Sequence, residues 1–236
     1  MQKVIGVIDL LDGKAVHAVA GNRDQYQSVA FCDGNAKKLA SHYRDLGTRG
    51  LYVADLDAIT TGKLQIEVIH GLCDLSADVD VLIDVGWTGI EESETITAVQ
   101  DLATLFPNTF WIIATESARS SHEIASLGDH IDPKRIVLGL DLHNGNLVTA
   151  DRDPKQTAEC WLDDAREAGC TRALVLDLAG VGVSEGPKTL DVCQEIHRSY
   201  PEFILYSGAG VRDGADVQAF IDAGCDRCLV ATALYR

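Results

Sequence analysis

Eight short apolar runs recur along this chain, and a helical pattern separates each run from the next. The runs are rich in Val, Ile and Leu and lack the polar alternation of a half-exposed strand, so we predict that each is a parallel strand covered on both faces. They occupy residues 4–8, 51–54, 79–85, 110–114, 135–140, 173–176, 203–206 and 228–231, and the helical patterns occupy residues 36–46, 64–72, 93–105, 120–127, 154–168, 188–200 and 215–223. Eight strands alternating with seven helices favour the α/β class, as a closed (β/α)8 TIM barrel rather than an open doubly wound sheet.

The barrel is predicted to be a single domain over residues 1–236, because no linker or low-complexity tract divides the chain. The last apolar run is followed only by residues 232–236, so the eighth helix is expected to be short or absent. The last strand would then be covered by a neighbouring helix or by a partner, which leaves a homo-oligomer open as an alternative.

Two segments of the chain nearly repeat each other without insertion or deletion. They read VIGVIDLLDGKAV at residues 4–16 and IVLGLDLHNGNLV at residues 136–148. Residues 51–56, LYVADL, likewise resemble residues 173–178, ALVLDL. Four strands followed by four similar strands predict two half-barrels, over about residues 1–130 and 131–236, with the first strand facing the fifth across the barrel axis.

Charge and cysteine usage limit the partners of the chain. Its formal net charge of -16 repels nucleic acid and anionic membrane surfaces, so neither is expected as a partner. No signal-peptide pattern opens the chain and no apolar run approaches the roughly 18 residues of a membrane span, so a cytoplasmic location is expected. The odd number of cysteines, seven, indicates a reducing compartment. Cys225 and Cys228 have the spacing of metal ligands but lack a second pair, so we expect buried thiols and no metal.

Several segments together resemble the histidine-biosynthesis barrels, the HisA/HisF family, and within it the isomerase branch HisA. They are residues 8–14 (IDLLDGK), 53–57 (VADLD), 137–141 (VLGLD), 207–211 (SGAGV) and 231–235 (ATALY), and the likeness covers nearly the whole chain. The resemblance implies an enzyme that converts a phosphorylated aminoaldose into an aminoketose by an Amadori rearrangement, without a metal or an organic cofactor.

The resemblance assigns the acid and base chemistry to two aspartates. Asp9 is expected to be the general base that removes the C2 proton of the sugar, and Asp141 the general acid that assists ring opening. Both follow a predicted strand, and barrel active sites lie at the carboxyl ends of the strands. Taken singly, an Asp in this position caps a loop or helix about as often as it acts in catalysis. Asp55 and Asp177 end the second and sixth strands, and we expect them to have structural or substrate-orienting roles.

The resemblance also implies two phosphate-binding turns, one in each half of the barrel. In the second half, the residues expected to surround a phosphate are Gly208, Gly210, Ala231 and Thr232. In the first half, the corresponding residues are Gly86, Gly89 and Thr115. His17 and Asp177 complete the expected substrate contacts.

The chain departs from the family pattern at several of these turns. Trp87 and Thr88 interrupt the first glycine run, Glu91 stands where a cation is usual, and Glu116 adds another carboxylate, so like charge disfavours a second phosphate there. His17 replaces an Arg of the first-strand loop, and residues 180–184, GVGVS, replace a charged tract after the sixth strand.

Three functions therefore stay open. The first is a HisA-like paralogue that acts on a smaller monophosphorylated or carbonyl-containing metabolite, as relatives beside one-carbon cofactor pathways do. The second, ranked slightly lower, is an authentic isomerase of histidine biosynthesis. The third is a non-catalytic barrel that binds a phosphorylated metabolite, which leaves the pair Asp9 and Asp141 unexplained.

Overall fold

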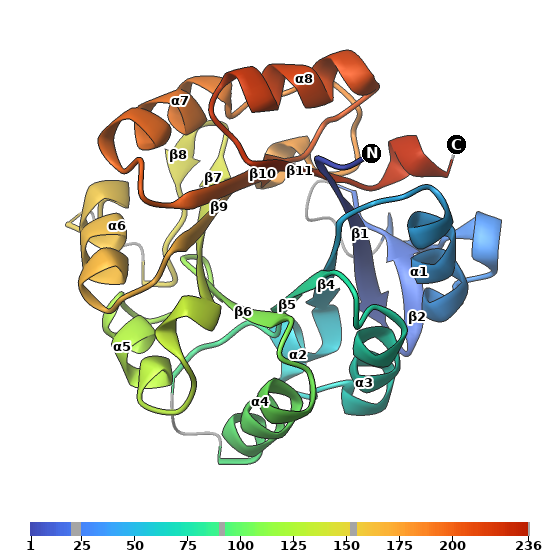
Figure 1. Cartoon of the computed structure of the whole chain (residues 1–236), viewed down its shortest axis with the longest axis horizontal. Helices are drawn as coiled ribbons and strands as arrows, with labels where there is room; N and C mark the ends of the chain where they lie inside the picture. Colours follow the sequence, from blue (N-terminus) through green and yellow to red (C-terminus); the bar gives the residue numbers. More distant parts are fainter. Residues whose placement is uncertain (20–24, 90–92, 152–154, 236) are drawn as a thin grey trace.

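The computed structural model describes residues 1–19, 25–89, 93–151 and 155–235. In these residues eight parallel strands form a barrel, which closes where β11 pairs with β1 at Cys228 and Val4 (Figure 1). In order around the ring the strands are β1 (Val4–Leu11), β4 (Gly50–Asp55), β5 (Asp80–Asp84), β6 (Thr109–Ala114), β7 (Ile136–His143), β9 (Arg172–Asp177), β10 (Ile204–Gly208) and β11 (Arg227–Val230). The predicted TIM barrel and its eight strands are confirmed.

Helices surround the strands as an outer layer (Figure 1). They are α1 (Ala36–Asp45), α3 (Ile66–Leu75), α4 (Ser93–Leu105), α5 (His122–Gly128), α6 (Ala158–Glu167), α7 (Leu190–Ser199) and α8 (Gly214–Asp222). The side chain of Thr157 accepts a hydrogen bond from the Cys160 N–H and so starts α6 at Ala158, later than the sequence pattern predicted. After β11 the described chain forms a single 3-10 turn over Thr232–Leu234.

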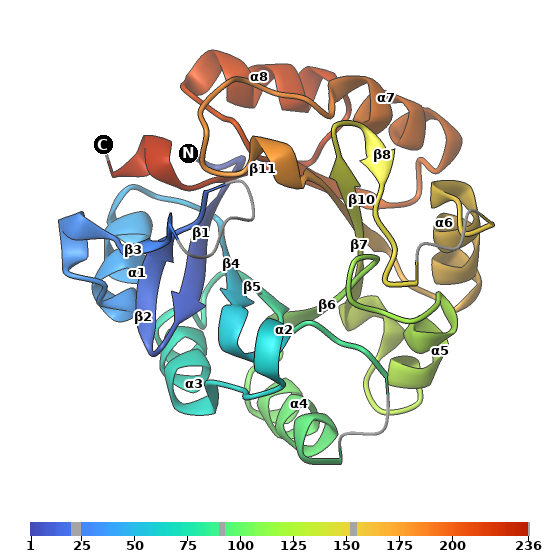
Figure 2. The ribbon, with the colours of Figure 1, turned by 180° about the vertical axis from the view of Figure 1, so that it is seen from behind.

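Short elements that the sequence pattern did not predict lie between the barrel strands and the helices. They are the strands β2 (Lys14–His17), β3 (Gln27–Ser28) and β8 (Asn146–Leu147), the helix α2 (Leu56–Thr61), and 3-10 turns over Ala30–Cys32, Pro133–Arg135 and Leu178–Gly180. In Figure 2 the strands β2 and β8 and the helix α2 lie at the end of the barrel that faces the viewer. β2, β8 and α2 each follow the carboxyl end of a barrel strand and so build the end at which the strands terminate.

The internal repeat produces the same hairpin twice. β1 turns into β2 through Asp12 and Gly13, with φ of 49° and 75°, and β7 turns into β8 through Asn144 and Gly145, with φ of 52° and 78°. Two successive left-handed residues form the type I′ turn that suits a two-residue hairpin, and Asp-Gly and Asn-Gly are its preferred sequences. The repeated pattern therefore encodes a strand that continues past the barrel and folds back.

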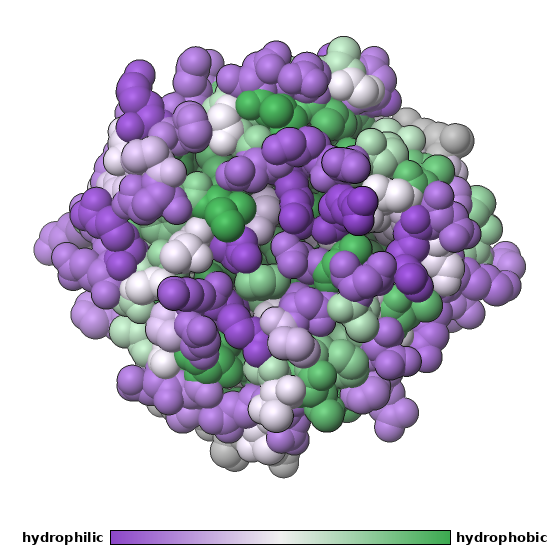
Figure 3. Space-filling model, viewed as in Figure 1, coloured by the Kyte–Doolittle hydropathy of each residue, from purple (hydrophilic) through white to green (hydrophobic). Residues whose placement is uncertain are grey.

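The opposite end of the barrel is filled by side chains. The guanidinium of Arg172 lies 4.1 Å from the centre of the Phe110 ring and donates a hydrogen bond to the Tyr206 hydroxyl at 3.0 Å. Arg227 pairs with Asp80 at 2.9 Å in the same region. Figure 3 shows hydrophilic side chains over much of this end of the molecule, with apolar ones between them. The open space of the barrel lies at the other end, where TIM-barrel active sites occur.

The core consists of an apolar layer inside the barrel and a larger one between strands and helices. Trp111 and Trp161 are fully buried in the outer layer, as expected of packing residues. No helix in the described part of the chain is long and apolar enough to cross a membrane.

Candidate active site

A cavity of about 240 Å³ opens at the carboxyl ends of the barrel strands. Its polar lining comes from both halves of the barrel, and the side chains that carry chemistry are Asp9, His17, Tyr26, Tyr52, Asp84, Glu116, Asp141, Ser184 and Thr232. Aliphatic side chains such as Leu56, Leu176 and Leu178 form the rest of the wall. Asp9 and Asp141, which the internal repeat places at matching positions, therefore face the same space.

Burial raises the pKa values of the aspartates in this cavity. The pKa of Asp9 rises from 3.8 to about 7, mainly because burial penalises its charged form; a hydrogen bond from the Ala18 backbone opposes the rise and the charge of Asp84 adds to it. Burial likewise raises the pKa of Asp84 to about 6. The pKa of Asp141 lies well above its ordinary value because of burial and the nearby charges of Glu116 and Asp84. The cavity therefore holds carboxyl groups that exchange protons near neutral pH.

Asp141 is fixed by hydrogen bonds with Thr115 and Glu116, which follow the neighbouring strand β6. The Asp141 N–H donates a hydrogen bond to Thr115 Oγ1 at 3.0 Å, and the Glu116 N–H donates one to Asp141 Oδ2 at 3.3 Å. Thr115 is fully buried and does not line the cavity, so it acts on the site through the position of Asp141.

Asp84 is held from two sides. Its Oδ1 accepts the Gly86 N–H at 2.9 Å and its Oδ2 accepts the Tyr52 hydroxyl at 3.4 Å. Sequence reasoning missed both Asp84 and Tyr52 as site residues. Asp84 is the last residue of β5, but the last residue of the matching strand β10 is Gly208, so symmetry gave no signal for Asp84.

The turns of the second half meet at one side of the cavity. Gly210, Ala231 and Thr232 line it, and Thr232 Oγ1 lies 3.4 Å from His17 Nδ1. Ala209 also lines it, with a φ of 70° that a residue other than glycine rarely adopts. Gly208 stands behind the wall, packed against Leu229 of the neighbouring strand β11. This side thus brings together three of the four residues expected around a phosphate.

The glycine turn of the first half lines a different cavity. Gly86 and Gly89, with Trp87 and the end of α2, surround a space of about 230 Å³. The Trp87 side chain is buried and fills part of this turn, and the carboxylate of Glu123 on α5 lies against Gly89, where a Cβ would be 3.1 Å from its Oε1. Glu91 lies outside the described residues. The structure therefore separates the two sets of expected phosphate contacts into two cavities.

Asp55 and Asp177 turn toward the backbone of the loops beside them. Asp177 accepts hydrogen bonds from the N–H groups of Asn144, Gly145 and Ala179 at 3.2, 2.8 and 3.0 Å. Asp55 accepts the N–H groups of Ala58 and Gln65 at 3.1 and 2.7 Å, together with the Gln65 side-chain amide at 2.8 Å. Neither residue lines the cavity. Their geometry is that of groups that hold the frame of the site.

Asp57 and Gln65 tether the turn of the first hairpin, between β1 and β2, by accepting hydrogen bonds from its backbone. The carboxylate of Asp57 accepts the Asp12 N–H at 3.1 Å, and Gln65 Oε1 accepts the Gly13 N–H at 2.6 Å. The turn between β1 and β2 is thus held by residues that follow the next barrel strand, β4. In the same way, Asp177 at the end of β9 holds the turn between β7 and β8.

No three His, Cys, Asp or Glu side chains in the described part of the chain are placed to hold a metal ion. The cysteines are free thiols, and all except Cys160 are buried. The cavity itself offers a set of carboxyl groups, two tyrosines, a histidine and the hydroxyl groups of Ser184 and Thr232.

Comparison with known proteins gives a consistent result. The profile of the family described as histidine biosynthesis protein matches residues 3–236. The chain is 29% identical over 237 residues to an uncharacterized protein of Methanocaldococcus jannaschii, covering 99% of this chain and 93% of that protein. It is 27% identical over 240 residues to the 1-(5-phosphoribosyl)-5-((5-phosphoribosylamino)methylideneamino)imidazole-4-carboxamide isomerase of Bacteroides fragilis, covering 100% of this chain and 95% of the relative. An isomerase of the same name from Bordetella pertussis is 28% identical over 239 residues, covering 98% and 92%. This chain belongs to the histidine biosynthesis protein family.

Proposed function

We propose that this protein is an isomerase that converts a phosphorylated aminoaldose into the corresponding aminoketose by acid and base catalysis with Asp9 and Asp141. The observation that carries the proposal is their placement: two aspartates from matching positions of the two halves line one cavity at the carboxyl ends of the strands. The raised pKa values of both fit proton transfer near neutral pH. The isomerase names of the Bacteroides and Bordetella relatives agree with this reaction class.

The two aspartates take opposite parts in the reaction. Asp141, whose pKa is raised further by its carboxylate neighbours, keeps a proton and donates it to the ring oxygen as the C1–O bond breaks, which leaves a protonated imine at C1. Asp9, with a pKa of about 7, is ionised in a large fraction of molecules at neutral pH and removes the proton from C2. The electron pair of the C–H bond forms the C1–C2 double bond and neutralises the imine nitrogen. The resulting enaminol becomes the aminoketose when its C2 hydroxyl loses a proton and C1 gains one, so two protons enter the substrate, two leave it, and no atom is gained or lost overall.

We further propose that the substrate is smaller than the bisphosphorylated compound named for the relatives. A single phosphate is expected beside Gly210 and Thr232, because that turn opens into the cavity that holds the aspartates. The first-half turn belongs to a separate cavity and has the Glu123 carboxylate against Gly89, which disfavours a second dianion there. The alternative is the imidazole carboxamide isomerase of histidine biosynthesis, acting in the cytoplasm; a paralogue in a one-carbon cofactor pathway would differ from it in substrate.

The test is turnover of the bisphosphorylated aminoaldose of the relatives by the purified protein. The Asp9→Asn and Asp141→Asn variants are measured in parallel, with Asp12→Asn as a matched control that removes an exposed carboxylate outside the cavity. Loss of a proton-transfer group is expected to lower turnover by about 10²–10⁴-fold in the first two variants only.

Each outcome selects one function. Turnover that depends on both aspartates assigns the histidine-pathway reaction to this protein. No turnover of that compound, with turnover of a monophosphorylated aminoaldose that needs both residues, supports the smaller substrate. Binding of phosphorylated sugars without any turnover overturns the enzyme proposal and leaves the non-catalytic barrel.

A further inference from the structure

The segment between β9 and α7 lies along the rim of the cavity. We call residues 181–186 the β9–α7 segment; its members Val181, Gly182 and Ser184 line the cavity beside the expected phosphate position. At one end Gly182 is so close to the first-strand hairpin that a Cβ there would lie 1.9 Å from the Ala18 carbonyl oxygen. At the other end the Gly186 N–H donates a hydrogen bond to the Gly210 carbonyl at 2.9 Å. The segment therefore spans the rim between two anchored ends.

The second anchor is reinforced by Arg212, the residue two positions after Gly210. A Cβ on Gly186 would lie 3.1 Å from both Cζ and Nη2 of Arg212, so the guanidinium fills the space beside Gly186 that a side chain there would need. Gly210 has no Cβ either, and one there would lie 2.3 Å from the Gly186 carbonyl oxygen. The two loop backbones can approach each other only because this contact surface is free of side chains.

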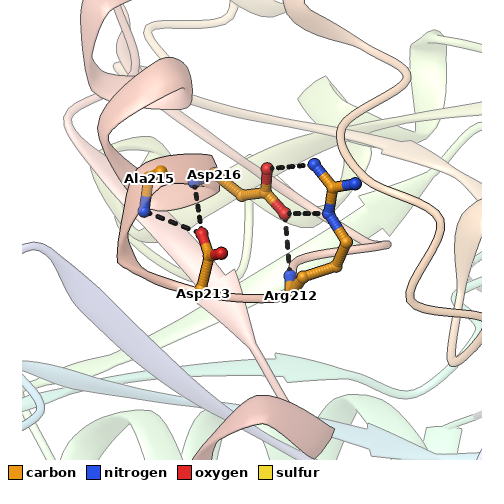
Figure 4. Close-up of polar contacts among 4 residues, drawn as sticks. All are labelled: Arg212, Asp213, Ala215 and Asp216. Atoms are coloured by element: carbon orange, nitrogen blue, oxygen red, sulfur yellow. Dashed lines mark hydrogen bonds and ion pairs between the residues drawn. The ribbon is translucent and has the colours of Figure 1, made fainter.

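Arg212 is itself fixed by one carboxylate. Asp216, on the first turn of α8, accepts three hydrogen bonds from it: from the backbone N at 2.9 Å, from Nε at 2.8 Å and from Nη2 at 2.8 Å (Figure 4). The Asp216 side chain is only 8% exposed, whereas that of Arg212 is 55% exposed. A planar guanidinium held by two parallel hydrogen bonds is a rigid surface even at an exposed position.

We infer that Arg212 is a positioning residue that holds the β9–α7 segment over the phosphate side of the cavity. It does so by presenting a flat, immobilised guanidinium to Gly186, while Asp216 supplies the immobilisation. An effect of Arg212 on substrate binding rests on the proposed function, because the β9–α7 segment lines the cavity in which that reaction is proposed to occur.

A simpler role for Arg212 is to stabilise the start of α8. The structure offers a matched control, since Asp213 caps the same helix through the N–H groups of Ala215 and Asp216 at 2.9 and 3.2 Å (Figure 4). Asp213→Ala therefore weakens the helix start without removing the guanidinium from Gly186. Arg212→Lys keeps a positive charge but removes the planar fork, so charge alone can be separated from shape.

The experiment is hydrogen exchange of the Gly186 amide, followed by NMR on ¹⁵N-labelled protein in the native enzyme and in Arg212→Ala, Arg212→Lys and Asp213→Ala. We expect the Gly186 amide to exchange at least about tenfold faster in both Arg212 variants and unchanged in Asp213→Ala, in which the amides of the first turn of α8 exchange faster instead. Unchanged exchange at Gly186 in Arg212→Ala, or equal acceleration in Asp213→Ala, overturns the inference.

A kinetic measurement then separates this inference from the proposed function. With a substrate that the parent protein turns over, Arg212→Lys is expected to raise KM by about tenfold and leave kcat nearly unchanged, because the segment contacts substrate away from the reacting carbons. A fall in kcat with unchanged KM contradicts a positioning role. If the parent protein turns over no substrate, the proposed function fails, while the exchange rates of Gly186 still decide the role of Arg212.

Discussion

Replacing Asp9 by Asn is expected to stabilise the folded protein increasingly as pH rises. The folded-state pKa of Asp9 is about 7, above the ordinary 3.8, so the folded protein binds this proton more tightly than the unfolded chain does. The stability that the bound proton contributes is fully present below pH 3.8 and is lost as pH rises toward 7. Asn has no proton to lose, so the variant escapes this loss.

The size of the effect follows from the pKa difference. One pKa unit corresponds to about 1.4 kcal/mol, so linkage gives a relative stabilisation of about 2 kcal/mol at pH 5 and about 4 kcal/mol at pH 8. The Asn side chain also changes the hydrogen bond from Ala18, which adds a constant that does not vary with pH. The quantity to compare is therefore the change between the two pH values, about 2–3 kcal/mol.

The assay is equilibrium urea unfolding of the parent protein, Asp9→Asn and Asp12→Asn at pH 5, 6, 7 and 8. Asp12 is an exposed residue at the turn after β1, and its replacement is expected to give a flat difference across this range. A flat difference for Asp9→Asn as well would refute the claim that burial sets the proton affinity of the site. A stabilisation that shrinks as pH rises would refute the direction of the shift.

Three further changes test other parts of the site. Thr115→Val removes the acceptor of the buried Asp141 N–H and should cost about 1–3 kcal/mol of unfolding free energy, together with turnover, whereas Thr115→Ser should retain both. Gly182→Ala places a Cβ against the Ala18 carbonyl and should weaken binding of inorganic phosphate at least about tenfold by calorimetry, with an unchanged circular dichroism spectrum; equal affinity would contradict the close approach. An aromatic disulfide reagent should react quickly with Cys160 alone in the native protein and with all seven thiols in urea, and a second fast thiol would contradict the burial of the others.

The sequence was sufficient for the barrel because buried parallel strands leave a strong local signal. The sequence pattern predicted less well the segments that continue beyond the barrel strands, such as the hairpin after β1. The pattern ended the first strand at residue 8, but β1 runs to Leu11 because Leu10 and Leu11 pair with Ala15 and Lys14 of the hairpin strand β2. The short helix α2 was missed because it has only six residues and its start depends on one side-chain contact, the Ala58 N–H to the Asp55 carboxylate.

The candidate site was predictable only in part for a related reason. Symmetry of the repeat singled out Asp9 and Asp141, and both line the cavity. It also singled out Asp55 and Asp177, which lie at similar strand ends but turn toward backbone N–H groups. The direction in which a carboxylate points at a strand end depends on the loops beside it, and no local pattern encodes that direction.

The duplicated hairpins have a consequence for how such a barrel can diverge. Each half ties its own hairpin turn with its own acceptors, Asp57 at Asp12 in one half and Asp177 at Gly145 in the other, and the two sets share no residue. A mutation in one half's ligand loop therefore leaves the other half's tether untouched. The first-half turn at Trp87 lines one cavity and the second-half turn at Gly210 lines another. The two halves nevertheless carry hairpins of the same type, β1–β2 and β7–β8. Because the two tethers are separate while the main cavity takes side chains from both halves, we expect a substitution in one tether to disturb only its own half of the cavity lining.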